Sequence, residues 1–179
     1  MAYTNKEIID FLSKTLNEEK YMHSLSVARE AVRLAKIYGV DIKKAYRAGL
    51  LHDITKCADN IALAKEYNID FVSEKTLHAR TGAIYCKLNN IEKNKKILSA
   101  IKNHTTGCAN MSLLEKIIYI ADISEPLRSY DEADEIRKIC DQDIDSAVLL
   151  SIKATLAKLK EKNLPIDFET LNAYNYYKK

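Results

Sequence analysis

The sequence predicts an all-α fold from three observations. The 179 residues include only four Gly, two Pro and no Trp, and this scarcity of turn residues favours long helices over many short strands. Apolar residues recur at spacings of three and four, the period of an amphipathic helix. No repeat, low-complexity tract or linker divides the chain. We therefore expect one helical domain over residues 1–179, with residues 167–179 as a C-terminal tail.

Composition narrows the class of protein. The apolar content of 47% is ordinary for a globular chain, and 28 Lys+Arg against 25 Asp+Glu leave a net charge of +3, too balanced to suggest nucleic-acid binding. The four cysteines are far apart and form no CxxC pair, which is typical of a reducing compartment. The first residues lack an apolar signal region, and no apolar run is long enough for a membrane span. We expect a cytoplasmic protein that binds neither membrane nor nucleic acid.

The N-terminal half is expected to contain five helices. Thr4 and Glu7 form a capping box at the start of the first. The second carries His23 on its apolar face and ends near Gly39. Asp41 begins a third, expected to run from residue 42 to about Lys56, with small residues that allow a neighbouring helix to approach beside His52: Ala45, Ala48 and Gly49. The remaining two cover residues 60–67 and 74–88.

Four more helices are expected in the C-terminal half. The first covers residues 93–104 and stops near Gly107. Ser112 and Glu115 form a second capping box, and the helix that follows reaches Asp122 and must end before Pro126. Residues 131–139 form a short acidic helix, and residues 143–159 form the most regular one. The tail, residues 167–179, shows no clear period.

The candidate chemistry lies in histidines and aspartates placed on apolar helix faces. All four histidines lie in helical segments, on or beside an apolar face: His23, His52, His78 and His104. Asp53 follows His52, and Asp122 ends an apolar run. A buried, unpaired carboxylate is costly, whereas a divalent cation would neutralise it and also bind imidazole nitrogen. Any one of these residues could instead be a satisfied core group, so the set as a whole carries the hypothesis.

The order His23, His52-Asp53, Asp122 resembles that of the HD-domain metal-dependent phosphohydrolases, which are all-helical. Within that superfamily, the chain is most similar to the YqeK-type symmetrical diadenosine tetraphosphate hydrolases. Two segments carry this closer resemblance, His-Thr-Thr-Gly at residues 104–107 and Ala-Asp-Ile-Ser-Glu-Pro-Leu-Arg at residues 121–128. The resemblance implies a single HD-domain-like helical bundle.

The resemblance also implies roles for the histidines and aspartates. His23, His52, Asp53 and Asp122 are expected to be metal ligands, with open positions left for water and phosphate. Asp53 is also the expected catalytic carboxylate. His78 and His104 are expected either to complete a second metal site, with Asp53 as its bridge, or to bind substrate phosphates.

Further residues are candidates for contacts with phosphate. Lys56, three residues after Asp53, could stabilise charge on a phosphoryl oxygen or only pair with Asp53. Arg128 could hold phosphate with its planar guanidinium, or pair with the acidic run that follows. Three more residues are nucleotide-binding candidates, each with a structural alternative as a helix cap or a solvated side chain: Lys20, Thr105 and Thr106.

The function implied is cleavage of diadenosine tetraphosphate into two ADP by attack of metal-activated water on a phosphoanhydride. Iron is the expected metal, in one or two ions, with manganese, cobalt or nickel as substitutes, because imidazoles argue against magnesium or calcium. The alternatives are an HD phosphohydrolase of another nucleotide and a non-catalytic nucleotide-binding HD module. A homodimer is an open alternative to a monomer.

Overall fold

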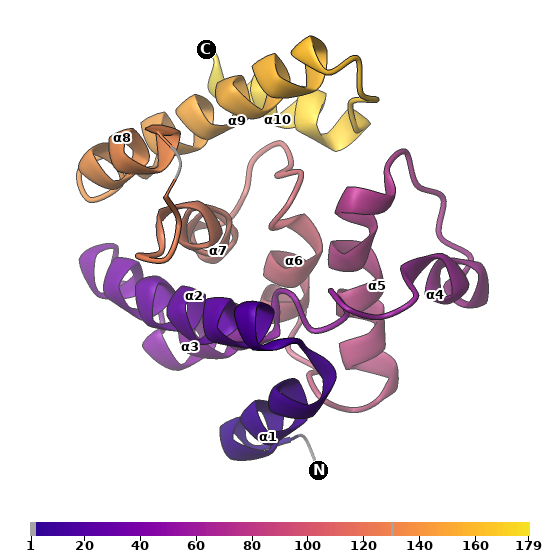
Figure 1. The fold of residues 1–179 in the computed structure, drawn as a ribbon. Coiled ribbons are helices and arrows are strands. Elements are labelled where there is room, and N and C mark those ends of the chain that lie inside the picture. Colours follow the sequence, from indigo (N-terminus) through magenta and orange to yellow (C-terminus); the bar gives the residue numbers. More distant parts are fainter. Residues whose placement is uncertain (1–2, 130) are drawn as a thin grey trace.

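Ten helices and no strand occupy residues 3–129 and 131–179, the part of the chain that the computed structural model describes. The helices, drawn in Figure 1, are α1 (Asn5–Thr15), α2 (Glu18–Ile37), α3 (Ile42–Leu51), α4 (Asn60–Tyr67), α5 (Glu74–Leu88), α6 (Lys95–Asn103), α7 (Leu113–Ser124), α8 (Asp131–Ile139), α9 (Ile144–Glu161) and α10 (Phe168–Tyr177). Both predicted capping boxes are confirmed, at Thr4 and at Ser112. The prediction of an all-α fold is therefore confirmed.

Helices α2 and α3 lie side by side and make the most extensive helix–helix contact among the described helices (Figure 1). The predicted small residues on α3 permit this approach: a Cβ atom added at Gly49 would lie 2.6 Å from Cα of Ala28 on α2. Ala45 and Ala48 are fully buried in the same contact region of the core. This packing places His23 on α2 next to His52 at the end of α3.

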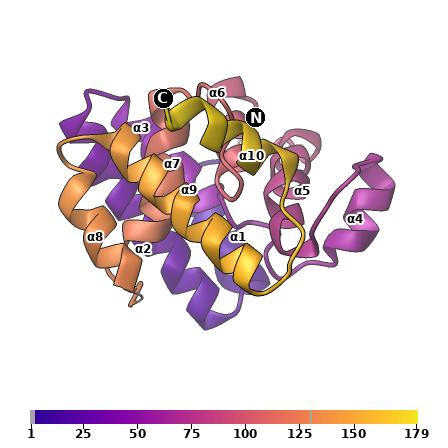
Figure 2. The same ribbon diagram turned by 90° about the horizontal axis from the view of Figure 1, so that it is seen from above.

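Helix α7 runs through the centre of the molecule and packs against α2, α6, α8 and α9. Its isoleucines at 117, 118 and 120 are fully buried, since the helix has neighbours on most sides. Helices α9 and α10 form the uppermost layer in Figure 1 and lie in front in Figure 2. Because α7 packs against α2, Asp122 near the end of α7 lies beside His23 of α2.

Helix α3 ends earlier than its apolar pattern predicts. The expectation of a helix to about Lys56 is wrong: α3 ends at Leu51, and residues 52–57 form successive turns. The side chain of His52 contacts the carbonyl oxygen of Gly49 at 2.7 Å, and this is the oxygen that Asp53 N–H would use if the helix continued. The turns instead use bonds to the third residue back, from Ile54 N to Leu51 O and from Lys56 N to Asp53 O.

Residues 167–179, where the sequence shows no clear period, form helix α10 over most of their length. Asp167 caps the helix by accepting from Glu169 N–H, and it also pairs with Arg80 on α5. Tyr177 receives a hydrogen bond from Met111 N–H at 2.9 Å, and Ala173 lies against Gly107. The C-terminal helix therefore packs on the loop that follows His104.

Among the described helices, none combines the length and the apolar content that crossing a membrane requires.

Candidate metal centre

The predicted ligands come from five separate helices or helix ends and meet at one place. His23 lies on α2, His78 on α5 and Asp122 on α7, whereas the other three occupy helix ends: His52 and Asp53 after α3, and His104 after α6. Four histidines and Asp53 are at most 5% exposed, and the Asp122 side chain is 18% exposed. The site is therefore buried, with an opening to solvent beside Asp122.

The rings of His52 and His104 are fixed in the same way. Nδ1 of His52 lies 2.7 Å from the carbonyl oxygen of Gly49, and Nδ1 of His104 lies 2.7 Å from that of Ile101. Because a carbonyl oxygen can only accept, each Nδ1 carries the proton and donates it. In the neutral ring Nε2 is then an unprotonated donor atom for a metal.

His23 has a different partner, the buried carboxylate of Glu125. Its Nδ1 lies 3.0 Å from Glu125 Oε1, and its Nε2 lies 2.9 Å from Asp122 Oδ1 and 3.3 Å from Nε2 of His52. Two unprotonated ring nitrogens at this separation repel each other unless a proton or a cation lies between them. This arrangement suits a metal ion.

Asp53 lies between the histidines and offers an acceptor with no aligned donor. Its Oδ1 lies 3.0 Å from Nε2 of His78 and 3.4 Å from Nε2 of His104, yet no hydrogen bond with acceptable geometry reaches it among the described residues. A buried carboxylate oxygen left in this state costs roughly 1–3 kcal/mol or more. A cation coordinated by Oδ1 would remove that cost.

Two overlapping triads have ligand atoms that all lie within 4.8 Å of one another. One is His23, His52 and Asp122; the other is His52, Asp53 and His104. Their donors are imidazole nitrogen and carboxylate oxygen, the set that borderline divalent metals prefer. His78 adjoins the second triad, with its Nε2 3.3 Å from that of His104. The residues present therefore fit a divalent metal.

Protonation also suits metal binding. Burial lowers the pKa of the His52 imidazole to about 3, and burial likewise lowers that of His78. Burial raises the pKa of Asp53, but the adjacent His52 and His104 outweigh it and hold that pKa well below the usual value. At neutral pH the two rings are therefore neutral and the carboxylate is charged, as metal coordination requires.

His23 is the exception among these ligands. Burial alone would lower its pKa, but the hydrogen bond and the charge of Asp122 raise it above the ordinary value. Burial raises the pKa of Asp122 in turn, but its contact with His23 brings it far below the usual value. A positive charge between these two side chains, whether a proton or a metal, is therefore favoured.

Two of the predicted phosphate-binding cations border the ligands. Nζ of Lys56 lies 2.9 Å from Nε2 of His78 and 3.6 Å from Asp53 Oδ1. Arg128 donates to Asp122 Oδ1 at 2.6 Å, and its NH2 also lies 3.1 Å from His23 Nε2. Their side chains are 32% and 30% exposed, so both reach from the ligands towards solvent.

The other nucleotide-binding candidates differ in what their side chains contact. The Thr105 hydroxyl is buried and has no hydrogen-bond partner in the described ranges. The hydroxyl of Thr106 donates to the carbonyl oxygen of Gly107 at 2.9 Å and thus stabilises the loop. Lys20 pairs with Glu19 at 2.8 Å. Thr105 is therefore better placed than Thr106 to donate to a ligand.

Three groups that orient the ligands were given no role by the sequence patterns: the Glu125 side chain and the carbonyl groups of Gly49 and Ile101. Glu125 belongs to the Ser-Glu-Pro segment that carries part of the resemblance, and that segment was the available signal. The two backbone carbonyl groups could not be recognised from the sequence, because every residue type has one.

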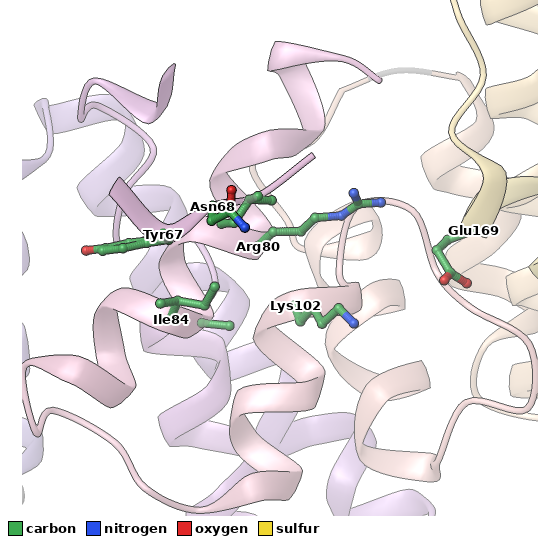
Figure 3. A pocket seen from close by; sticks show the side chains of 8 residues that line it. Tyr67, Asn68, Arg80, Ile84, Lys102 and Glu169 are labelled. Carbon is green, nitrogen blue, oxygen red and sulfur yellow. The ribbon is translucent and has the colours of Figure 1, made fainter. Parts of the chain in front are cut away.

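A cavity of about 390 Å³ is lined by residues of α5, α6 and α10 and of the end of α4 (Figure 3). Arg80 and Lys102 extend towards Glu169 of α10, while Tyr67 and Asn68 border the opposite end. Arg80 follows His78 by two residues, which is about 200° around the helix, and Lys102 precedes His104 by two. None of the predicted site residues lines this cavity.

Comparison with known proteins agrees with this geometry. A model of the HD domain family matches residues 21–127. The chain is 37% identical over 167 residues to the symmetrical bis(5'-nucleosyl)-tetraphosphatase of Halalkalibacterium halodurans, covering 89% of each protein. It is 33% identical over 178 residues to that of Bacillus subtilis, covering 96% of each.

A solved structure from Clostridium acetobutylicum is also similar. It is described as a "predicted HD superfamily hydrolase involved in NAD metabolism". It is 37% identical to this chain and superposes with a TM-score of 0.92 over 99% of this chain and 98% of that one.

Proposed function

This chain belongs to the HD domain family, and we propose that it is a metal-dependent hydrolase that cleaves diadenosine tetraphosphate symmetrically into two ADP. Water would add to one of the two central phosphorus atoms, and the central P–O–P linkage would break. One tetraphosphate and one water then give two diphosphates, so the reaction balances.

The observation that carries this proposal is the convergence of the predicted ligands. Nε2 of His23 and of His52 face each other at 3.3 Å beside Asp122, while Asp53 offers an oxygen with no aligned donor. Similarity to two symmetrical tetraphosphatases over most of both chains supports the choice of substrate. We assign His23, His52, Asp53 and Asp122 as the metal ligands.

When bound, a divalent cation would acidify water and polarise a phosphoryl oxygen. The negative charge of Asp53 would offset the positive charge of the cation at the centre of the site. Its position between two histidine pairs suits a carboxylate that is shared by two ions. Lys56 and Arg128 would stabilise the negative charge that develops on the phosphoryl oxygens, because both side chains extend from the ligands to solvent. The hydroxyl of Thr105 would donate to a substrate oxygen.

For the metal we propose iron. Imidazole-rich sites favour transition metals over magnesium and calcium, and no cysteine belongs to either ligand triad. Protein purified without oxygen should contain iron, by elemental analysis, at one or two ions per chain. Stoichiometric zinc in that sample would overturn the assignment of iron.

The activity test uses Asp53→Asn beside wild type and the exposed control Asp10→Asn. Even residues that only orient metal ligands change activity about 10- to 100-fold, so loss of a central ligand should lower kcat by more than about 100-fold. Ion-exchange chromatography should show ADP as the only product of wild type and of the control.

Four outcomes would contradict the proposal. Formation of ATP and AMP would rule out symmetrical cleavage, and full activity in Asp53→Asn would rule out the ligand set. Faster turnover of another nucleotide in a panel at equal concentration would move the proposal to a different HD phosphohydrolase, whereas binding without turnover would indicate a non-catalytic module.

A further inference from the structure

Glu125 is an acidic side chain buried beside the metal centre without being one of its ligands. It is the C-terminal cap of α7 and is 1% exposed. Its Oε1 lies 3.0 Å from Nδ1 of His23, and its Oε2 accepts a hydrogen bond from Leu127 N–H at 2.7 Å. Both oxygens therefore have defined donors.

The backbone of Glu125 is held as firmly as its side chain. Its N–H donates to Ala121 O at 3.1 Å, and its carbonyl oxygen accepts from Arg128 N–H at 3.0 Å and from Arg137 at 2.8 Å. The residue is thus tied to α7, to the loop after it and to α8. A carboxylate fixed in this way can impose an orientation on the ring that it contacts.

His23 differs from His52 and His104 in its Nδ1 partner. Those two rings donate to uncharged backbone carbonyl groups, whereas the His23 ring faces a carboxylate. A carboxylate behind an imidazole fixes the tautomer and also makes the opposite nitrogen a stronger ligand.

We propose that Glu125 is a positioning residue that keeps the Nδ1 proton on His23 and directs Nε2 of that ring to the metal. The inference rests on the proposed metal-dependent function, but it concerns metal affinity and not the identity of the substrate. Its consequence is an asymmetric centre, in which the His23–Asp122 side binds a cation more tightly than the side formed by His78 and His104.

Glutamine has the same shape as glutamate, but in place of Glu125 it cannot make both hydrogen bonds. The carboxylate accepts from two donors, Nδ1–H of His23 and N–H of Leu127. An amide has one accepting oxygen, so either orientation places its NH2 against a donor. The ring of His23 can relieve that conflict only by moving its proton to Nε2, which abolishes metal binding there.

The test measures binding of Mn²⁺ alone to metal-free protein by calorimetry, in wild type, E125Q and the matched control E92Q. Glu92 is also a buried carboxylate, 6% exposed, which accepts from Lys93 N–H and pairs with Arg47 away from the centre. We expect E125Q to weaken the tightest Mn²⁺ site about 10- to 100-fold and E92Q to leave it unchanged. Unchanged affinity in E125Q, or an equal loss in E92Q, would overturn the proposal.

A second measurement needs no variant and so survives poor folding of E125Q. Two-bond ¹⁵N–¹H NMR spectra of metal-free wild type, recorded at a pH above the end of the His23 titration that the same spectra follow, report which ring nitrogen carries the proton. His23 should show protonated Nδ1 and unprotonated Nε2. The opposite tautomer would refute the role of Glu125, whatever substrate the enzyme cleaves.

Discussion

At the scale of single residues, the groups that contact the proposed metal ligands determine which ring nitrogen is available to a metal. The Nδ1 atoms of His23, His52 and His104 each contact a different acceptor, and all three contacts leave Nε2 to face the centre. Neighbouring residues of one type can likewise have unrelated roles. Thr105 and Thr106 are adjacent, but among the described residues only the Thr106 hydroxyl donates a hydrogen bond to a backbone carbonyl group.

This difference between the threonines gives a matched pair of variants. Thr105→Val removes a hydroxyl that has no partner in the described structure, so stability should change little while kcat/KM falls about 10-fold, the value of one hydrogen bond to a charged group. Thr106→Val removes a bond inside the buried loop and should lower the free energy of unfolding by about 1 kcal/mol. Steady-state kinetics and urea unfolding of both variants separate the two roles, and the reverse pattern would reassign them.

The sequence singled out four metal-ligand candidates and two further histidines, and the fold brings all six side chains together, but the sequence did not predict how they are oriented. Each candidate could be singled out because an ionisable side chain stood on or beside an apolar helix face, in an order that resembles a known family. Glu125 could not be assigned in this way, because its partner His23 lies 102 residues away and only the fold brings the two together. The carbonyl partners of His52 and His104 escape detection because every residue has a carbonyl group.

At the scale of helices, two helix ends are built in the same way. His52 and His104 each follow the last residue of a helix, and each Nδ1 takes the carbonyl oxygen three residues back. In a continuing helix that oxygen would accept from the residue after the histidine. The imidazole thus ends the helix and fixes its own tautomer in one contact. The spacing of apolar residues does not show that a side chain competes with a backbone N–H for the same carbonyl oxygen. For this reason α3 was expected to continue to Lys56.

The contact between α2 and α3 can be tested at Gly49. The added methyl group of Gly49→Ala would meet Ala28 backbone at 2.6 Å, so the helices must separate. We expect a loss of about 1–3 kcal/mol in the free energy of unfolding and weaker Mn²⁺ binding, because His23 and His52 move apart. The comparison variant is Gly82→Ala, where the nearest atom is the side-chain Oγ1 of Thr55 at 3.2 Å. If the two variants lose equal stability, backbone contact is not the cause.

Glu115 connects α6 to α7 through a charge that depends on pH. Burial raises its pKa, but hydrogen bonds from Ser112, Ser99 and Asn103 outweigh this effect and lower it. A carboxyl whose pKa is lowered by folding contributes stability above its unfolded pKa of about 4.3 and loses it as pH falls through the folded value.

Glu115→Gln should therefore be less stable than wild type near pH 7, by about 1–3 kcal/mol. The difference should shrink as the pH falls below about 4.3, because only wild type then loses this contribution. Urea unfolding of metal-free protein across this range measures it, since the histidines titrate equally in both proteins. The exposed residue Glu161 provides the control Glu161→Gln. A difference that stays constant with pH would show that the charge is not involved.

At the scale of the whole molecule, a metal would join helices that are distant in sequence. The two ligand triads draw on α2, the end of α3, the end of α6 and α7, so residues 23–122 close around one point. These four segments would then be linked through the bound metal, whether one ion or two. Binding to the folded chain alone also raises its stability by mass action.

Metal removal should accordingly lower the melting temperature. With free Mn²⁺ at 100 times its Kd, the gain is about 2.7 kcal/mol, or roughly 5–10 °C for a chain of this length. Calorimetric melting with Mn²⁺ and with chelator measures the shift. Asp122→Asn should abolish most of it, and the exposed variant Asp10→Asn should retain it. A full shift in Asp122→Asn would place the stabilising ion elsewhere.

The fold followed from the sequence where local signals were strong. The capping residues Thr4 and Ser112 marked helix starts correctly, because a side chain that accepts from the first turn leaves a residue signature. Helix α10 had no such signature in the sequence. It begins at Asp167, which pairs with Arg80 of another helix, and it packs against the loop after His104. Such elements become predictable only once the rest of the fold is known.

Gly49 has a consequence for how this protein can change over evolution. The residue has no functional group and touches no substrate, yet its missing side chain sets the distance between α2 and α3, and its carbonyl group orients His52. A mutation there alters two properties of the centre in a single step. A lineage that replaced Gly49 would need a compensating change at the Ala28 backbone, which no side-chain substitution supplies. We therefore expect this position to accept substitutions as rarely as the ligands themselves.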